Sequence, residues 1–245
     1  MKLYLILCLI LVLIYFYYIK NLNKEYFNNN DVTYIFWTGG YDSTFRLCEL
    51  LIIKKRIVQP IYVSYNLDSE RNSDMWVRKN KKNEIETMNN IKKILNIRFP
   101  YVKSLLRPIQ FIENNFIDNN YDSNIHKLNL WPNKRKIHQY INLGKITYHM
   151  KVPIELGVLG IDLDSNFIKF INKHIDRDTN KLIVDKNHPL YYFEFPLFNK
   201  TKKDLCRIAK YHNFDDIIRK SWSCWFPQNN KPCKKCPMCR HRFNC

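Results

Sequence analysis

The sequence lacks both of the most common nucleotide-binding loops, because neither G-x-x-x-x-G-K-S/T nor G-x-G-x-x-G occurs in it. It has no internal repeat, which excludes a solenoid or a propeller. Acidic residues are scarce: 22 Asp and Glu stand against 40 Lys and Arg, for a formal net charge of +18. This excess favours an anionic partner such as a nucleotide, a nucleic acid or an acidic membrane surface. Biased composition is the alternative, because no arginine and aromatic pattern typical of RNA-binding proteins is present.

The N-terminus carries a long apolar run. Residues 3–19 are 17 consecutive apolar residues between Lys2 and Lys20, and about 25 Å of helix is just enough to cross a bilayer. A cleaved signal peptide is the alternative, but no small-residue cleavage site follows the run. We therefore predict a single-pass membrane anchor and the start of a linker over residues 1–24. Lys20 and Lys24 favour a cytoplasmic location for the rest of the chain.

Beyond residue 31 the hydrophobic pattern alternates between strands and helices. The predicted strands are residues 32–37, 57–65, 98–105, 153–162 and 191–197. The predicted helices are residues 42–55, 83–95, 137–152, 166–175 and 202–214. Strands separated by helices predict an α/β fold with an open, mainly parallel sheet and helices on both faces.

The first predicted strand is followed by the stretch TGGYDST. It lies at the carboxyl end of the strand, where open α/β sheets bind ligands. Gly39 and Gly40 allow backbone N–H groups to converge on an anion, and the next helix adds its positive end, so the turn predicts a phosphate site. Hydroxyls of Ser43 and Thr44 could add donors, and Asp42 could help position Mg²⁺. A glycine turn with Asp42 or Ser43 merely capping the helix is the alternative.

The C-terminal segment has four cysteines in a C-x8-C-x2-C-x2-C pattern, namely Cys224, Cys233, Cys236 and Cys239. Four thiolates at this spacing predict a closed, tetrahedral Zn²⁺ site. Disulfides and an iron–sulfur cluster are the alternatives. Three other cysteines fall on apolar helical faces and are predicted to be packed thiols: Cys8, Cys48 and Cys206. Cys245 is the terminal residue.

Together the two motifs resemble one family. TGGYDST resembles the S-G-G-x-D-S-T/S loop of the PP-loop ATP pyrophosphatases, and the cysteine segment is similar to the zinc motif of 7-cyano-7-deazaguanine synthase, the nitrile-forming enzyme of the queuosine pathway. The stretch FPLFNKTKKDLCRIA adds to the resemblance, with Thr201 and Lys202 at matching positions. The resemblance spans roughly residues 32–243 and implies an adenine nucleotide alpha hydrolase-like fold.

The resemblance also implies a reaction. Enzymes of that family split ATP between its α and β phosphates and activate a carboxylate as an acyl-adenylate. Ammonia then displaces AMP, and ATP is used again to dehydrate the amide to a nitrile. For this chain the implied cofactors are ATP, Mg²⁺ and Zn²⁺, and the implied substrates are a heterocyclic carboxylate and ammonia. The implied domains are an ATP pyrophosphatase domain over residues 25–215 and a zinc-binding segment over residues 216–245.

The implied site residues follow from the matching positions. The ATP site is assigned to Thr38, Gly39, Gly40, Tyr41, Asp42, Ser43 and Thr44, and catalytic roles to Asp42, Ser43 and Lys202. Thr38 stands where the family usually has serine, and its hydroxyl preserves the chemistry. On the substrate side, only Tyr65 and Asp162 stand at matching positions. Two alternatives stay open: a tRNA-modifying PP-loop adenylase, favoured by the net charge, and a non-catalytic, membrane-anchored nucleotide-binding module.

Overall fold

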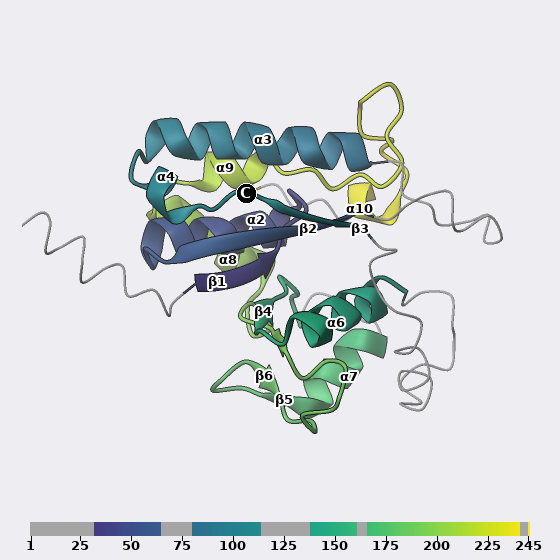
Figure 1. Cartoon of the computed structure of the whole chain (residues 1–245). Helices are drawn as coiled ribbons and strands as arrows, with labels where there is room; N and C mark the ends of the chain where they lie inside the picture. The colour runs from purple at the N-terminus through teal and green to yellow at the C-terminus, as the bar shows by residue number, and fades with distance from the viewer. Residues whose placement is uncertain (1–31, 65–79, 114–137, 161–165, 241–244) are drawn as a thin grey trace, which may run out of the picture. The chain divides into compact units, whose positions relative to one another are not determined.

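The computed structural model describes residues 32–64, 80–113, 138–160, 166–240 and 245 (Figure 1). Chain contacts divide the protein into two units, Met1–Val32 and Thr33–Cys245, and the second unit holds nearly all of the described residues.

The first half of the chain folds largely as its hydrophobic pattern predicts. Strand β1 (Val32–Phe36) is followed by helix α2 (Tyr41–Cys48), which continues as a π-helical turn, η1 (Glu49–Ile53). Strand β2 (Ile57–Ser64) and helix α3 (Lys81–Arg98) come next. The helical spacing of α3 predicts one apolar face, on which Met88, Ile91 and Leu95 are fully buried and Ile85 is partly buried.

The strand predicted at residues 98–105 is wrong. The chain there forms a turn at Pro100 and a short helix, α4 (Val102–Leu105), in which Val102 and Leu105 are buried at i, i+3 spacing. The strand lies further on, as β3 (Gln110–Glu113), and pairs in parallel with β2 from Ile61 onward. Proline and a helical spacing of apolar residues therefore outweigh the local strand preference.

The second half contains the predicted helices, while its strands are shorter than predicted. In order, the elements are α6 (His138–Met150), β4 (Ile154–Glu155), α7 (Asn166–His174), β5 (Ile175–Asp176), β6 (Lys181–Leu182), β7 (Phe193–Glu194), α8 (Lys202–Tyr211), α9 (Asp215–Arg219) and α10 (Pro237–Arg240). The hairpin formed by β5 and β6 was not predicted, because two-residue strands leave no alternating pattern in the sequence.

The strands form one sheet in the order β3-β2-β1-β4-β7-β6-β5. The pairs β2–β3, β1–β4 and β4–β7 are parallel, and β6 is antiparallel to both β5 and β7. The predicted α/β fold with a mainly parallel sheet is therefore confirmed. Because β1 comes first in the chain and has neighbours from both halves, the loop that follows it lies at a topological switch point.

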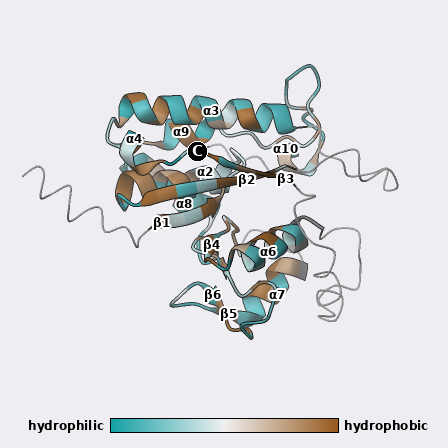
Figure 2. Ribbon diagram, in the orientation of Figure 1, coloured by the Kyte–Doolittle hydropathy of each residue, from teal (hydrophilic) through white to brown (hydrophobic). Residues whose placement is uncertain are grey.

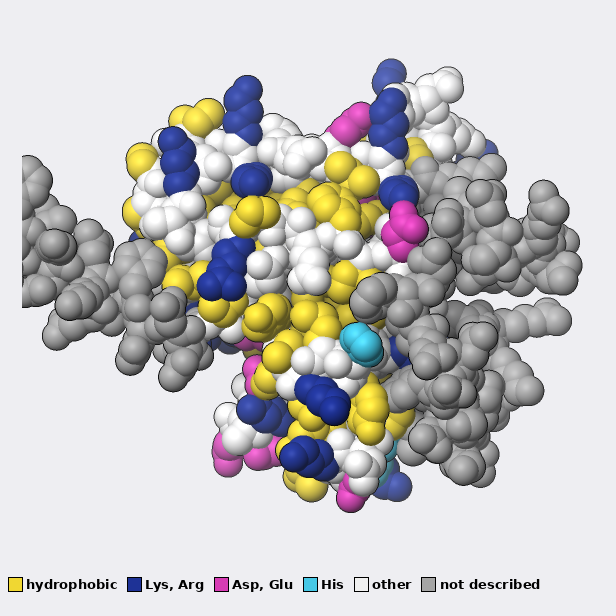
Figure 3. Space-filling view, viewed as in Figure 1, with side chains coloured by type: hydrophobic (Ala, Val, Ile, Leu, Met, Phe, Trp, Pro, Cys, Tyr) yellow, Lys and Arg dark blue, Asp and Glu magenta, His cyan; other side chains and the backbone are white. Residues whose placement is uncertain are grey.

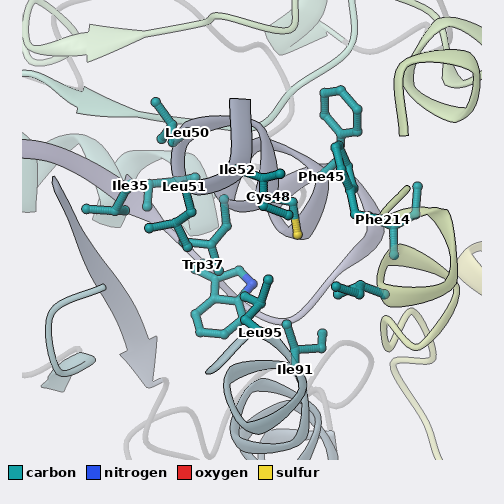
Figure 4. Close-up of a cluster of buried hydrophobic side chains, with 14 of the residues drawn as sticks. Ile35, Trp37, Phe45, Cys48, Leu50, Leu51, Ile52, Ile91, Leu95 and Phe214 are labelled. Carbon is teal, nitrogen blue, oxygen red and sulfur yellow. The ribbon is translucent and has the colours of Figure 1, made fainter. Parts of the chain in front are cut away.

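Two apolar cores cover the two faces of the sheet. One contains Ile35 and Trp37 of the β1 region with side chains of α2 and α3 (Figure 4), and also side chains of α8 and α9. In Figure 2 the ribbon of α3 alternates between brown, hydrophobic residues and teal, hydrophilic ones. The other contains Phe36, which points to the opposite face, with side chains of α6 and α7. Helices on both faces are thus confirmed, and Phe45 of α2 packs against Phe214 at a ring distance of 5.7 Å.

The predicted membrane anchor requires a correction. Residues 3–19 lie outside the described residues, and among the residues that are described no helix has the length and apolar character needed to cross a bilayer. The predicted transmembrane helix and membrane-anchored location are therefore withdrawn, and the described residues give no support for a membrane partner.

The prediction of packed thiols is confirmed for Cys48 and wrong for Cys206. Cys48 is fully buried in the core that contains Ile35 and Trp37, and burial raises the pKa of its thiol. Cys206 of α8 forms a disulfide with the terminal Cys245, 39 positions away, with a Cα–Cα distance of 5.2 Å. Cys8 lies outside the described residues. Nothing local in the sequence marks a pair at such a separation.

Candidate functional site

The loop between β1 and α2 is held in a shape that only glycine can adopt without strain. Gly39 has φ of +71°, in the left-handed region. A Cβ atom there would lie 3.2 Å from side-chain carbons of Thr87 and Met88 and 3.3 Å from the carbonyl oxygen of Glu84. Helix α3 therefore packs directly against the loop, and the Trp37 N–H donates to the Ile61 carbonyl at 2.9 Å to fix where the loop begins.

Helix α2 begins with an open first turn. Gly40 is its N-cap residue, with φ of −70° and ψ of 162°, and no described side chain caps the helix there. The Gly40 carbonyl accepts the backbone N–H of Thr44 at 2.9 Å and the hydroxyl of Ser43 at 3.3 Å. The alternative in which Asp42 or Ser43 caps the helix is therefore wrong. The backbone N–H groups at the start of a helix and the positive end of its dipole suit an anion.

The remaining loop residues have different surroundings. Thr38, Tyr41, Asp42 and Ser43 are half-buried. Burial raises the pKa of the Tyr41 phenol, and the nearby carboxylates raise it further. Thr44 is fully buried and its hydroxyl accepts the indole N–H of Trp37 at 3.1 Å, which favours a structural role for it.

Lys202 is the first residue of α8, a helix that packs against α2. That helix begins with a capping box, in which Thr201 accepts the N–H of Asp204 at 3.2 Å and Asp204 accepts the N–H of Thr201 at 3.1 Å. The capping box fixes the position from which the Lys202 side chain starts. Its role as a countercharge stays a prediction.

Gly157 completes the loop, and sequence reasoning missed it. It follows β4, and a Cβ atom added there would lie 3.1 Å from the backbone nitrogen of Ser43 and 3.2 Å from the carbonyl carbon of Asp42. The chain after β4 thus passes directly over the first turn of α2. The available signal was a glycine just past a strand, which marks a close approach of two backbones.

A buried ion pair fixes α2 against the sheet. Arg46 donates to both carboxylate oxygens of Glu155 in β4, at 2.7 and 2.6 Å, and to Glu49 at 2.6 Å. Burial alone would lower the pKa of the guanidinium, but the hydrogen bonds and charges of the two carboxylates more than offset this and raise it. The ion pair holds in place the helix that follows the loop. No local sequence pattern predicts it, because Arg46 and Glu155 are 109 positions apart.

The four cysteines of the C-terminal segment lie together. Their sulfur atoms are all within 4.8 Å of one another, and those of Cys233 and Cys239 are 4.0 Å apart. A single ion with bonds of about 2.3 Å to four sulfurs at tetrahedral angles requires sulfurs about 3.8 Å apart. The cluster therefore fits a metal ion with little movement, as its spacing in the sequence predicts.

Backbone N–H groups stabilise the thiolate form in this cluster. The pKa of the Cys233 thiol is lowered to about 6, because the N–H groups of Lys235 and Cys236 point at its sulfur. Burial instead raises the pKa of Cys224, and it raises that of Cys239 to about 12. A bound cation would favour the thiolate form of all four cysteines.

One protein-family profile matches the C-terminal third of the chain. The profile described as "Queuosine biosynthesis protein QueC" matches residues 162–245. No curated protein sequence matches the chain. The substrate-side residues Tyr65 and Asp162 lie outside the described residues, so the structure does not place them.

Two solved structures share 13% sequence identity with the chain. One is a predicted subunit of tRNA methyltransferase from Methanocaldococcus jannaschii, with a TM-score of 0.38 and coverage of 74% of each chain. The other is the U34-tRNA thiolase NcsA from Methanococcus maripaludis with its [4Fe-4S] cluster, with a TM-score of 0.41, covering 86% of this chain and 63% of the thiolase. At these scores neither structure carries an argument about function.

Proposed function

We propose that this chain, whose residues 162–245 match the QueC profile, is a QueC-like PP-loop ATP pyrophosphatase. It is an ATP-dependent adenylating enzyme that converts a heterocyclic carboxylate of the deazaguanine type to a nitrile. The observation that carries the proposal is the Gly39–Gly40 turn, which leads into an uncapped first turn of α2 at the carboxyl end of β1. Such a turn binds phosphate.

The proposed reaction has two activations. A carboxylate oxygen attacks the α-phosphorus of ATP and pyrophosphate leaves, which forms an acyl-adenylate. Ammonia attacks the acyl carbon and AMP leaves, which gives an amide. The amide oxygen then attacks a second ATP and pyrophosphate leaves again. Loss of that oxygen with AMP, and of both protons from nitrogen, gives the nitrile.

The loop residues act on the leaving pyrophosphate. Backbone N–H groups of Gly40 and Ser43, already oriented by the turn, stabilise the charge that develops on it. Asp42 is the carboxylate of the loop and would hold Mg²⁺, which supplies neutralisation of phosphate charge when it is bound. Lys202 is proposed as a further countercharge.

The metal of the four-cysteine cluster is proposed to be one structural Zn²⁺. Four thiolates fill a tetrahedral shell and leave no position for an activated water. In a four-iron cluster each thiolate binds a different iron, so the sulfurs stand farther apart than around one ion. The short distances between these sulfurs support the single ion.

A tRNA-modifying adenylase is the second candidate. Helix α3 and the turn after it carry a surface groove of about 600 Å³ that includes Lys92, Lys93 and Lys103, and no acid lines it among the described residues. Figure 3 shows Lys and Arg side chains over this part of the face in view. Together with the net charge of +18, this favours a polyanion.

The acceptor dependence of AMP formation tests the proposal. Full-length protein is incubated with ATP, Mg²⁺ and ammonia, and with either a deazaguanine carboxylate or unmodified tRNA, and products are identified by mass spectrometry. We expect amide and then nitrile with the carboxylate. Formation of AMP with tRNA alone would favour the second candidate. Bound ATP without AMP formation with either acceptor would indicate a non-catalytic nucleotide-binding module.

A further inference from the structure

Trp222 joins the nucleotide loop to the four-cysteine cluster through two hydrogen bonds. Its backbone N–H donates to the carbonyl oxygen of Gly39 at 2.9 Å. Its indole Nε1–H donates to the carbonyl oxygen of Cys224 at 2.7 Å. Trp222 therefore contacts both sites, although Gly39 and Cys224 are 185 positions apart in the sequence.

The first hydrogen bond controls the Gly39–Gly40 peptide. A trans peptide is planar, and its C=O and N–H point in opposite directions. Holding the Gly39 oxygen towards Trp222 therefore directs the Gly40 N–H to the opposite side. A peptide between two glycines has unusual rotational freedom. Without this hydrogen bond the Gly40 N–H, a proposed phosphate donor, would sample other directions.

The second hydrogen bond reaches a residue that the metal would restrain. Cys224 is only 2% exposed, and its sulfur accepts the backbone N–H of Cys233 at 3.2 Å. A metal bound to that sulfur would fix Cys224, whose carbonyl holds the Trp222 indole. A bound metal would thereby restrain the Trp222 side chain and backbone, and through the backbone hydrogen bond it would restrain the Gly39 carbonyl.

We propose that Trp222 is a positioning residue that couples metal binding in the cysteine cluster to phosphate binding at the Gly39–Gly40 peptide. The inference rests on the proposed function and adds a role to the metal, which sets nucleotide affinity as well as stability. Such coupling is reciprocal, so a bound nucleotide raises the equilibrium affinity for the metal by the same factor.

Trp222→Phe tests the coupling, because it removes the indole N–H and keeps an aromatic ring and the backbone N–H. We expect full-length protein with one metal per chain to bind α,β-methylene-ATP roughly 3- to 10-fold more weakly in calorimetry, the effect of one lost hydrogen bond. This analogue resists cleavage between the α and β phosphates. Trp225→Phe is the matched control, since it makes the same substitution at the residue that follows Cys224 in the sequence, and it should bind like the wild type.

A spectroscopic signal separates positioning from a general effect on folding. With Co²⁺ in the cluster, the thiolate-to-metal absorption reports the geometry of the four sulfurs. Addition of α,β-methylene-ATP should change this spectrum and raise the Co²⁺ affinity in the wild type and in Trp225→Phe. In Trp222→Phe both responses should be lost or much reduced.

The outcomes distinguish this inference from the proposed function. A wild-type protein that binds the analogue, but whose cobalt spectrum and cobalt affinity do not respond to it, would overturn the coupling alone. So would a Trp222→Phe protein that binds and responds like the wild type. A wild-type protein that does not bind the analogue would overturn both. If Trp222→Phe does not fold, the wild-type spectrum and metal affinity decide by themselves.

Discussion

Replacing Gly157 with alanine places one methyl group against the proposed phosphate site. The new Cβ would lie 3.1 Å from the Ser43 nitrogen and 3.2 Å from the Asp42 carbonyl carbon. These are backbone atoms of the first turn of α2, so the helix itself has to shift. Overpacking of this kind costs about 1–3 kcal/mol of stability. Losing a well-aimed hydrogen bond to a charged phosphate costs about 1.5–3 kcal/mol, which corresponds to roughly 10- to 100-fold in affinity.

Calorimetry with α,β-methylene-ATP and thermal unfolding measure the two effects separately. Gly144→Ala is the matched control, because its Cβ first meets the end of the Leu190 side chain at 2.9 Å, far along the chain from the loop. In a helix interior, replacing glycine with alanine raises the stability by about 0.5–1 kcal/mol, which offsets part of the cost of that close contact. Gly157→Ala should lose nucleotide affinity, and Gly144→Ala should keep it. Unchanged affinity in Gly157→Ala, or an equal loss in both variants, would refute the reasoning.

Three further predictions concern the loop, the cluster and the cap of α8. Gly40→Val should abolish nucleotide binding in calorimetry, because its side chain would stand in the proposed phosphate site. The protein should stay folded, because the nearest atom to the new Cβ is the side-chain oxygen of Thr38, at 3.3 Å. Nucleotide binding as in the wild type would show that the loop does not bind phosphate. Cys236→Ser should lose the metal in elemental analysis and unfold the C-terminal segment, since structural zinc contributes on the order of 10 kcal/mol, whereas Cys48→Ser should keep it; a stable Cys236→Ser protein with its metal would contradict the site. Thr201→Ala should cost about 1 kcal/mol in urea unfolding. The backbone N–H of Thr201 and, second, its hydroxyl lower the pKa of Asp204, so their stabilisation should be present above the unfolded-state pKa and lost as the pH falls through the folded one. Alanine keeps the backbone N–H and removes only the hydroxyl, so the variant should lose part of this pH dependence; a pH dependence equal to that of the wild type would exclude a contribution of the hydroxyl.

The parts that the sequence predicted well are those with local signals. The buried strand before Thr38, the glycine turn and the helical face of Met88, Ile91 and Leu95 are each encoded within a few residues. The four-cysteine cluster is similar, because its members lie within 16 consecutive residues counted from Cys224 to Cys239 (239 minus 224, plus 1).

The parts that were missed depend on distant residues. Gly157 touches Ser43 only because β4 lies beside β1 in the sheet. The Arg46–Glu155 pair and the Cys206–Cys245 disulfide likewise join segments that no local pattern connects. The strand predicted at residues 98–105 was wrong for a local reason. A proline turn there outweighs the strand preference of the aromatic residues in this stretch.

The bond at which ATP is cleaved tests the central claim most directly. Full-length protein is incubated with Mg²⁺, ammonia, a deazaguanine carboxylate and ATP labelled at the α phosphate, and the labelled products are separated. We expect labelled AMP with an equal amount of unlabelled pyrophosphate, in a reaction that depends on the carboxylate and is lost in Gly40→Val. Labelled ADP with inorganic phosphate, or AMP formed equally well by Gly40→Val, would contradict it.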